Sequence, residues 1–466
     1  MVQPAREERA ELTTHLRRLT RTWGNEESVT LFLDRCRVDT PEALVAATWK
    51  HVLELRSGIR KVIDFGAGDG RFARHGEFSE YIGYEIDRSR CSRNLSVPGA
   101  ELVNRCAFSD EIHDADVCIG NPPFVRNQDL PSGWRQKAAE VLQRRTGVEL
   151  SGLANAWQYF FLLALASTTC NGLCALILPF EWVSRPSVRR LRDYIAYNKW
   201  NVSVYRLVDS TFNSVLTTSS ITIIDKSELR GNWRYFEETS DGSYRALDSP
   251  SGGPAGVLPY LKRSEVDRSG PMAIRGLSPG TQKVLTLTEG ERVRNGLSPE
   301  RDVVPCTTTL RPLPPDALML DASTFRSNFR ETGEKCWLIR TDTEPSTRLK
   351  SYIESVPPRL YQTSTCMERQ VWWQFAMPPI PDVLISMSFR GQFPKAVTNE
   401  IGARAIGGVY GIYNLSSTQA SQITEGLGGV DIRGRIVAHS HGLRKLEVNQ
   451  LNALLSEAFG TNIKES

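Results

Sequence analysis

The chain of 466 residues lacks any apolar run that approaches the ~20 residues of a membrane-spanning helix. It also lacks a cysteine framework, because its nine cysteines are odd in number and their spacing spells out neither a disulfide scaffold nor a zinc site. Six histidines are scattered along the sequence, and none belongs to a recognisable catalytic or metal-binding group. These absences predict a protein of a reducing, cytoplasmic compartment with no bound metal.

A strong excess of charge of one sign is also missing. The formal net charge is only +4, which excludes a strongly basic nucleic-acid-binding chain. A hydrophobic content of 40% and a charged content of 24% are typical of a globular protein with a large core. The length predicts two or three domains.

The most informative segment present is Asn121-Pro122-Pro123-Phe124, which follows an apolar run at 116–120 and so is expected at the end of a buried strand. An open α/β sheet places its chemistry at such ends. The amide oxygen of Asn121, the carbonyl of Pro122 and the flat ring of Phe124 suit an amino group conjugated to an aromatic ring. The alternative is an ordinary turn, because proline fixes φ and restricts the residue before it.

A glycine-rich turn lies upstream and leads into an expected helix. A short apolar strand at 61–64 ends in Asp64, and the glycines at 66, 68 and 70 follow in a G-x-G-x-G pattern. Glu85 ends the next strand, at about the ~20-residue separation at which an acidic residue meets a ribose. Together these features predict a nucleotide-type cofactor in a crevice that three strand ends share.

At these motifs the sequence resembles the gamma-class N6-adenine DNA methyltransferases, which use S-adenosylmethionine. The resemblance covers roughly residues 36–228, and its order of motifs, cofactor turn before Asn-Pro-Pro-Phe before a recognition domain, is the gamma arrangement. It implies an α/β, Rossmann-like catalytic domain with a doubly wound, mostly parallel sheet. It also implies a C-terminal α+β target-recognition domain.

The resemblance further implies the residues of the site. The expected catalytic residues are Asn121, Pro122, Pro123, Phe124 and Phe212. The expected cofactor-binding residues are Thr40, Asp64, Gly66, Gly68, Glu85, Ile86, Phe108 and Phe160. The sequence departs from the family at Ala107, where an acid usually accepts a hydrogen bond from the cofactor adenine. Asp110 or the main chain is expected to replace that acid.

The implied activity is transfer of a methyl group to the N6 amine of a flipped adenine in duplex DNA, as the modification enzyme of a restriction-modification system. A separate restriction endonuclease is an expected partner. The open alternatives are methylation of cytosine N4, of an RNA base or of a protein glutamine amide, and a non-catalytic DNA-binding subunit on the same fold. The large C-terminal half favours DNA.

Linker-like composition around residues 240–254 predicts three parts: a catalytic domain at 1–228, a linker at 229–258 and a recognition domain at 259–466. Two basic patches are candidates for phosphate contact, with solvated faces as the alternative. Their members are Arg185, Arg189, Arg190 and Arg192 in the first patch, and Arg359, Arg369, Arg390, Lys395 and Arg404 in the second.

Overall fold

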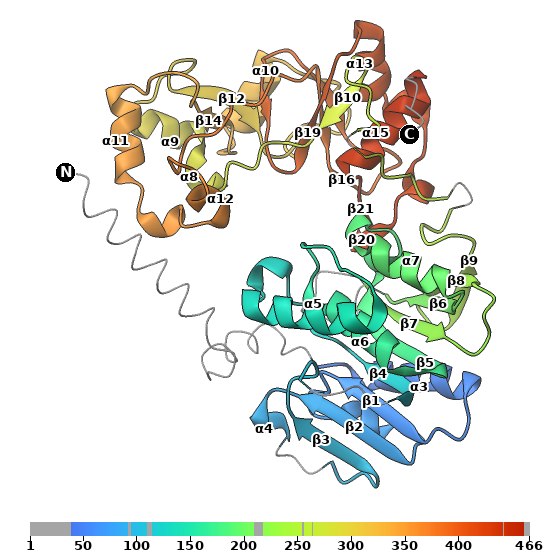
Figure 1. Ribbon diagram of the computed structural model, residues 1–466. Helices are drawn as coiled ribbons and strands as arrows, with labels where there is room; N and C mark the ends of the chain where they lie inside the picture. The colour runs from blue at the N-terminus through green and yellow to red at the C-terminus, as the bar shows by residue number, and fades with distance from the viewer. Residues whose placement is uncertain are drawn as a thin grey trace. The chain divides into compact units, whose positions relative to one another are not determined.

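The computed structural model describes residues 39–91, 95–109, 114–208, 218–253, 256–262, 264–440 and 442–460. The chain divides into two compact units. The N-terminal unit runs to residue 254 and includes 439–441, and the C-terminal unit is formed by 255–438 and 442–466. Figure 1 colours the first from blue to green and the second from yellow to red.

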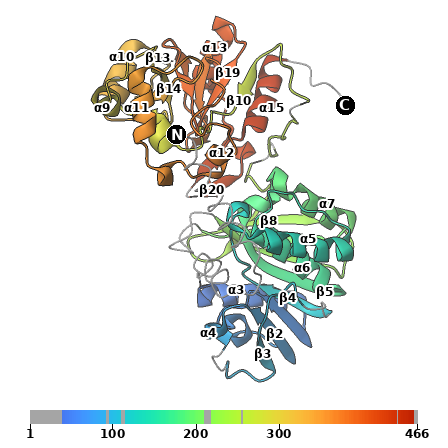
Figure 2. The ribbon, with the colours of Figure 1, turned by 60° about the vertical axis from the view of Figure 1, so that its left-hand side comes forward.

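A nine-stranded sheet forms the centre of the N-terminal unit. Its strands are β1 (Lys61–Phe65), β2 (Glu80–Glu85), β3 (Ala100–Asn104), β4 (Ala115–Gly120), β5 (Thr168–Pro179), β6 (Asn201–Arg206), β7 (Ser219–Asp225), β8 (Trp233–Glu238) and β9 (Tyr244–Leu247). Their order is β3-β2-β1-β4-β5-β7-β6-β8-β9. Strands β1 to β5 are parallel to one another, whereas β7 is antiparallel to both β5 and β6. Figure 2 shows the blue strands β2 and β3 side by side.

Helices accompany this sheet at several points. They are α3 (Glu42–Leu55), η1 (Arg71–Arg74), α4 (Arg88–Cys91), η2 (Asn127–Asp129), α5 (Ser132–Thr146), α6 (Ala156–Ser167), η3 (Phe180–Val183), η4 (Pro186–Val188) and α7 (Arg189–Tyr197). Alternate strand residues point to opposite faces. Val117 and Ile119 of β4 pack with Leu44 and Val52 of α3, while α6 contacts β4 and β5. The predicted α/β class with a mostly parallel sheet is therefore confirmed.

The expected linker at 229–258 is wrong for most of its length. Strand β8 pairs with β6 in parallel, and β9 pairs with β8, so both extend the large sheet. The turn residues at 239–243 that suggested a linker join these two strands into a hairpin. The first unit consequently ends near residue 254.

The C-terminal unit is built from short elements. Its strands are β10 (Met272–Ile274), β11 (Thr286–Leu287), β12 (Val303–Thr307), β13 (Met319–Leu320), β14 (Trp337–Ile339), β15 (Val383–Ser386), β16 (Ser388–Phe389), β17 (Ala396–Asn399), β18 (Arg404–Ala405), β19 (Val409–Tyr413) and β21 (Leu443–Lys445). Strand β20 (Ala438–Ser440) begins in this unit, and its last two residues belong to the N-terminal unit. Its helices are α8 (Gln282–Leu285), α9 (Glu289–Arg294), α10 (Ala322–Phe325), η5 (Arg326–Arg330), α11 (Thr347–Ser355), η6 (Pro358–Leu360), α12 (Ser364–Met367), α13 (Ser417–Thr424), α14 (Gly426–Gly429), η7 (Arg433–Arg435) and α15 (Val448–Phe459).

A five-stranded sheet with the order β10-β19-β15-β17-β13 separates two cores of this unit. Leu384 of β15 belongs to one core, together with Leu349 of α11. Its neighbours Val383 and Ile385 belong to the other, together with Leu451 of α15. The period-two alternation of a strand thus buries both faces of the sheet. A mixed domain of α and β elements follows the large sheet, as predicted.

Candidate functional site

Three predicted site residues stand at the ends of neighbouring parallel strands. In the register of the sheet, Asp64 of β1 lies opposite Gly83 of β2 and Ile119 of β4. Glu85 ends β2, and Asn121 directly follows β4. The chain continues from β1 to β2 and β3 on one side and to β4 and β5 on the other, so this edge is the switch point at which open α/β sheets bind ligands. The structure brings these three residues to one edge.

The turn after β1 folds back on the end of β2. The main-chain N–H groups of Gly66 and Ala67 both donate to the Tyr84 carbonyl, each at 2.9 Å, and the N–H of Gly68 donates to Glu85 Oε2 at 2.8 Å. Gly66 and Gly68 have φ angles of 89° and 61°, which residues with a Cβ rarely adopt. Glycine is therefore required here by the backbone. The helix expected after the turn is only the short 3₁₀ helix η1.

Asp64 is fully buried, and its two carboxylate oxygens have different surroundings. Oδ2 accepts a hydrogen bond of 2.7 Å from the Tyr81 hydroxyl, whereas Oδ1 has no hydrogen-bond partner among the described residues. Burial raises the pKa of Asp64 to about 7, against the opposing effect of the Tyr81 hydrogen bond. A Cβ at Gly120 would come within 2.2 Å of Oδ1. The orphaned oxygen suits a cationic or hydrogen-bond-donating ligand group.

Glu85 is held by main-chain donors on both carboxylate oxygens. The N–H of Asp87 donates to Oε1 at 2.8 Å, and that of Gly68 donates to Oε2. Burial raises the pKa of Glu85, and these hydrogen bonds oppose the rise. Each oxygen keeps acceptor capacity, so the carboxylate is fixed in position and can still accept from a ligand. Ile86, the predicted adenine contact, is half-buried beside it.

Asn121 makes a hydrogen bond to a residue 81 positions away. Its Nδ2 donates to Thr40 Oγ1 at 3.0 Å. Pro122 is buried, while Pro123 and Phe124 are half-buried. A Cβ at Gly66 would lie 3.5 Å from Pro123 Cδ, so the glycine turn and the Asn-Pro-Pro-Phe segment lie against each other. The tetrapeptide is therefore not packed away from the predicted cofactor turn.

Arg71 is a residue of this site that the sequence analysis missed. Its Nε and Nη2 donate to Asp69 Oδ1 and Oδ2 at 2.8 and 3.0 Å, and its Nη1 donates to the main-chain carbonyl of Thr40. The pairing with Arg71 lowers the pKa of Asp69 although burial opposes it. The Asp-Gly-Arg sequence at the end of the turn was the available signal for this pair.

Two predicted cofactor contacts belong to a buried aromatic cluster. Phe108 meets Phe160 edge to face, with ring centroids 5.2 Å apart, and meets Trp134 in the same way at 5.3 Å. Trp134 also stacks on Phe160 at 6.2 Å. Such pairs hold aromatic rings in fixed orientations. The sequence analysis did not identify Trp134, which α5 supplies, and Ala107 beside this cluster is buried.

Two of the sequence predictions lie outside the described residues. They are Phe212, expected as a second wall for the target base, and Asp110, expected as a substitute for the missing acid. Both remain predictions.

Two protein-family models match the chain in succession. The model described as "Eco57I restriction-modification methylase" matches residues 83–213, and the model described as "Type II methyltransferase M.Eco57I, C-terminal domain" matches residues 283–426. Over these two stretches the chain is similar to the Eco57I restriction-modification methyltransferases. The first match contains Glu85 and Asn121, so it covers part of the edge described above.

A curated relative of the chain is distant. The Type II methyltransferase M.AccI of Acinetobacter calcoaceticus is 24% identical over 122 residues, which are 26% of this chain and 22% of the relative. The chain thus spans about a fifth of the length of the curated relative it matches.

Solved structures resemble this chain only weakly. The type IIG restriction endonuclease BpuSI has a TM-score of 0.39 and 12% identity over 88% of this chain and 57% of its own. A type I restriction-modification methyltransferase subunit from Streptococcus thermophilus has a TM-score of 0.36 and 17% identity over 45% of this chain and 50% of its own.

The first predicted basic patch and two residues of the second have partners within the chain. The first-patch arginines contact Glu181, Asp193, Glu149 and the main-chain carbonyls of Trp182 and Arg185. In the second patch, Arg369 donates to the Pro279 carbonyl and Lys395 to the Leu313 carbonyl. Phosphate would have to share or replace these partners. Contact of either patch with DNA stays a prediction. Where a side chain already has a partner in the protein, we expect it to contribute less to DNA affinity than an unpaired one would.

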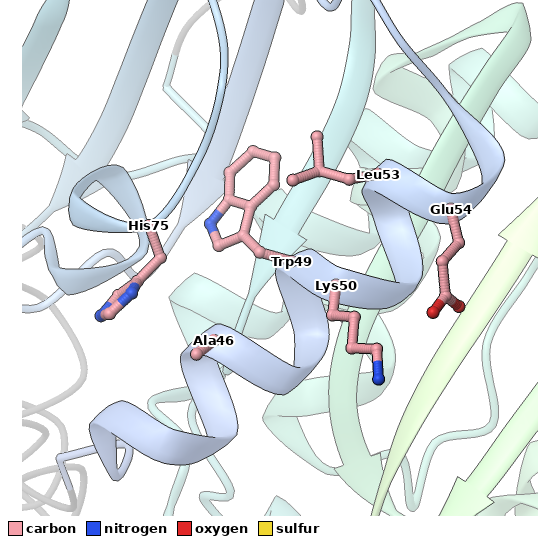
Figure 3. Close-up of a pocket in the computed structure, with 6 residues that line it drawn as sticks. All are labelled: Ala46, Trp49, Lys50, Leu53, Glu54 and His75. Atoms are coloured by element: carbon pink, nitrogen blue, oxygen red, sulfur yellow. The ribbon is translucent and has the colours of Figure 1, made fainter.

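An open hollow of about 540 Å³ lies along α3, away from the predicted site residues. Figure 3 shows its lining side chains, which are Ala46, Trp49, Lys50, Leu53, Glu54 and His75. None of the six was predicted to bind cofactor or substrate. Among the described residues, no group of three or more His, Cys, Asp or Glu side chains could hold a metal ion. In the same part of the chain, no helix has the length and apolar character to cross a membrane.

Proposed function

We propose that the protein is an S-adenosylmethionine-dependent DNA methyltransferase that modifies the N6 amine of adenine in duplex DNA. The observation that carries the proposal is the contact between the two predicted motifs, where Gly66 of the cofactor turn lies against Pro123. A group bound by the turn and an amine bound by Asn121 would therefore meet at one edge of the sheet. The match of residues 83–213 to the Eco57I methylase model supports the reaction class and the cofactor.

The described residues fit S-adenosylmethionine. The orphaned oxygen of Asp64 suits the ammonium group of the methionine end. Glu85, fixed by two main-chain donors, suits the ribose hydroxyls. Ile86 and Phe108 suit the adenine, with Phe160 behind Phe108. When bound, this cofactor supplies an electrophilic methyl group carried by a positively charged sulfur.

The Asn-Pro-Pro-Phe segment suits the target amine. An adenine amine is a poor nucleophile because its lone pair is delocalised into the ring. Acceptance of its two hydrogens by Asn121 Oδ1 and the Pro122 carbonyl favours a pyramidal nitrogen and frees that lone pair. Phe124 stacks on the base. Positioning then supplies much of the rate acceleration, without a histidine or cysteine base.

An adenine within a duplex must be extruded before its amine can reach such an edge. We therefore propose base flipping, with residues 259–466 as the target-recognition domain. The match of residues 283–426 to the C-terminal domain of a Type II methyltransferase supports this division. A cytoplasmic location and a separate cognate endonuclease follow from the restriction-modification family and belong to the same proposal.

Product analysis tests the reaction. The full chain is incubated with duplex DNA and methyl-labelled S-adenosylmethionine, and the DNA is digested to nucleosides. Label in N6-methyldeoxyadenosine is the expected result. Label in N4-methyldeoxycytidine would show that the target base is cytosine and not adenine. Label only in RNA or in protein glutamine would reject DNA as substrate. Absence of label from all of these substrates would favour the non-catalytic DNA-binding alternative.

Calorimetry tests the cofactor separately. Glu85→Ala should weaken binding of S-adenosylmethionine by roughly tenfold or more, because charge-assisted hydrogen bonds contribute about 1.5–3 kcal/mol. Glu101→Ala on the neighbouring strand β3 is a matched control, since it removes an exposed carboxylate. Equal affinities of the two variants would remove Glu85 from the cofactor site.

A further inference from the structure

The segment Asp39-Thr40 precedes α3 and lies against the strand end that carries Asn121. Thr40 is buried, with 5% of the residue exposed, and its hydroxyl oxygen lies 3.0 Å from Asn121 Nδ2. Among the described residues, no hydrogen bond joins the main chain of Asp39 or Thr40 to another main-chain group. In the part of the chain that the structure describes, side chains therefore hold the segment in this position.

Arg71 supplies the contact to the main chain of this segment. Its Nη1 donates to the carbonyl of Thr40. A guanidinium only donates and a carbonyl only accepts, so this hydrogen bond has one possible direction. The same guanidinium is fixed on the glycine turn, because its Nε and Nη2 donate to Asp69 Oδ1 and Oδ2 at 2.8 and 3.0 Å. A bidentate arginine–carboxylate pair has a defined geometry. Arg71 thus fastens the segment to the turn.

The carboxylate of Asp39 adds two ion pairs to this contact. Its Oδ2 lies 3.2 Å from Arg71 Nη2, and its Oδ1 accepts a hydrogen bond of 2.8 Å from Arg90 Nη2 of α4. A Cβ at Gly68 would come within 2.7 Å of Arg90 Nη1, so Arg90 lies against the glycine turn. Half of the Asp39 side chain is exposed, and exposed ion pairs contribute little. Arg71, whose side chain is 16% exposed, is therefore expected to be the stronger anchor.

We propose that Arg71 is a positioning residue, which holds the Asp39-Thr40 segment against the glycine turn and so completes the binding site for S-adenosylmethionine. This inference rests on the proposed methyltransferase function and on the expected contact of Thr40 with the cofactor. Without Arg71 the segment occupies this position for only a fraction of the time, and the apparent affinity for the cofactor falls by that fraction. Bound cofactor holds the segment in place again, so turnover at saturating cofactor is retained.

The test compares Arg71→Met with Arg74→Met in the full chain. Both arginines belong to η1, both pair with Asp69, and both substitutions remove one positive charge. Arg74 differs in its other side-chain partner, because it donates to Glu42 Oε1 of α3 at 3.0 Å and not to the Asp39-Thr40 segment. Arg71→Lys keeps the charge but not the planar fork that binds several acceptors at once. Thermal melts of the three variants measure any general loss of stability.

Two measurements separate positioning from stability. Hydrogen exchange of the ligand-free chain should be faster in peptides covering residues 39–45 in Arg71→Met, and unchanged there in Arg74→Met. Calorimetric affinity for S-adenosylmethionine should fall roughly tenfold in Arg71→Met, as expected for loss of a charge-assisted hydrogen bond, and should match the wild type in Arg74→Met. Arg71→Lys should recover part of the affinity, and kcat of Arg71→Met at saturating cofactor should match the wild type. Equal affinities of the two methionine variants, or a lowered kcat at saturating cofactor with full affinity, would overturn the inference.

A second pair of variants decides the question if Arg71→Met does not fold. The side chains of Asp39 and Glu42 are 50% and 49% exposed, and each pairs with two basic side chains. Asp39→Asn should weaken S-adenosylmethionine binding by about threefold, in keeping with the modest strength of an exposed ion pair, whereas Glu42→Gln should not. Equal affinities of these two variants contradict the inference. Absence of cofactor binding by the wild type would instead reject the proposed function, and hydrogen exchange of the ligand-free chain would still report whether Arg71 holds the segment.

Discussion

Asp64 in the N-terminal unit and Glu289 in the C-terminal unit are carboxylates in opposite states. Asp64 is fully buried with a single hydrogen bond from Tyr81, and its pKa is raised to about 7. Glu289 accepts hydrogen bonds from Arg292, Arg330 and the indole of Trp337, and the first of these partners does most to lower its pKa to about 2. One oxygen of Asp64 lacks a hydrogen-bond partner among the described residues, whereas both oxygens of Glu289 have partners.

The difference fits the proposed role of Asp64 in ligand binding and a structural role for Glu289. Both oxygens of Glu289 have partners supplied by the protein, so the group stabilises the fold without a ligand. Asp64 keeps an orphaned oxygen that is costly in the absence of a partner. A buried polar group left unsatisfied needs an explanation, and for Asp64 we propose a ligand that completes the hydrogen bonding. Four predictions test this contrast.

The largest effect is expected at the edge that Asp64 shares with Asn121. Asn121→Ala should lose at least ~100-fold in turnover, as expected for removal of a preorganised polar group that acts in the transition state. Binding of S-adenosylmethionine, measured by calorimetry, should be retained. A variant that turns over at the wild-type rate would contradict the assigned role. Asn198→Ala, on the C-terminal cap of α7, is a control that should leave turnover unchanged.

The glycines beside the two carboxylates provide the second comparison. Gly120 has a φ of 147°, and a Cβ there would come within 2.2 Å of Asp64 Oδ1, so Gly120→Ala should lower the free energy of unfolding by roughly 2–3 kcal/mol. Gly290 lies in helix α9 beside Glu289, where a Cβ meets nothing closer than 3.9 Å. Gly290→Ala should raise stability by about 0.5–1 kcal/mol. Chemical denaturation, followed with probes in each unit, measures the change in the free energy of unfolding for both variants. Changes of the same sign would contradict the contrast between the surroundings of Asp64 and Glu289.

The third prediction concerns the pH dependence at Asp64. Its folded-state pKa is raised from 3.8 to about 7, so the folded protein holds a proton there that the unfolded chain releases. Stability of the N-terminal unit should therefore fall as pH rises through this window. If the ionised carboxylate binds the ammonium group, cofactor affinity should rise with pH through about 7. Calorimetry of Asp64→Asn should give a profile without this rise, and identical profiles would exclude Asp64 as its source.

The fourth prediction concerns Glu289, whose contribution to stability changes with pH in the direction opposite to that of Asp64. The folded-state pKa of Glu289 is lowered from 4.5 to about 2, so its stabilising contribution is fully present above pH 4.5 and is lost as pH falls toward 2. Glu289→Gln should lower stability of the C-terminal unit near neutral pH by about 1 kcal/mol and weaken its dependence on acid pH. Hydrogen exchange of peptides from this unit measures the change. Cofactor affinity should be unaffected, because the cluster is complete without a ligand.

Much of the N-terminal unit could be predicted because its signals are local. The apolar run before Asn121 and the one that ends in Asp64 were both predicted as strands, and they form β4 and β1. Parallel strands with adjacent ends follow from such elements, so the common edge of Asp64, Glu85 and Asn121 was foreseeable. The roles of these residues with ligands remain predictions.

The failure at the linker has a different physical cause. Turn-forming residues at 239–243 indicated a linker, but a turn between strands has the same composition as a linker, and only pairing with β6 shows that β8 belongs to the sheet. Composition does not reveal which partner a segment meets.

The sequence by itself determined the strands, the glycine turn and the identity of the polar groups at the strand ends, because each depends on residues that are close along the chain. Only the tertiary structure decided that Thr40 accepts from Asn121 and that Arg71 holds Thr40 in place. These contacts join residues 81 and 31 positions apart, and their geometry depends on how α3 packs against the sheet. Long-range packing, which no local pattern encodes, brings these groups together.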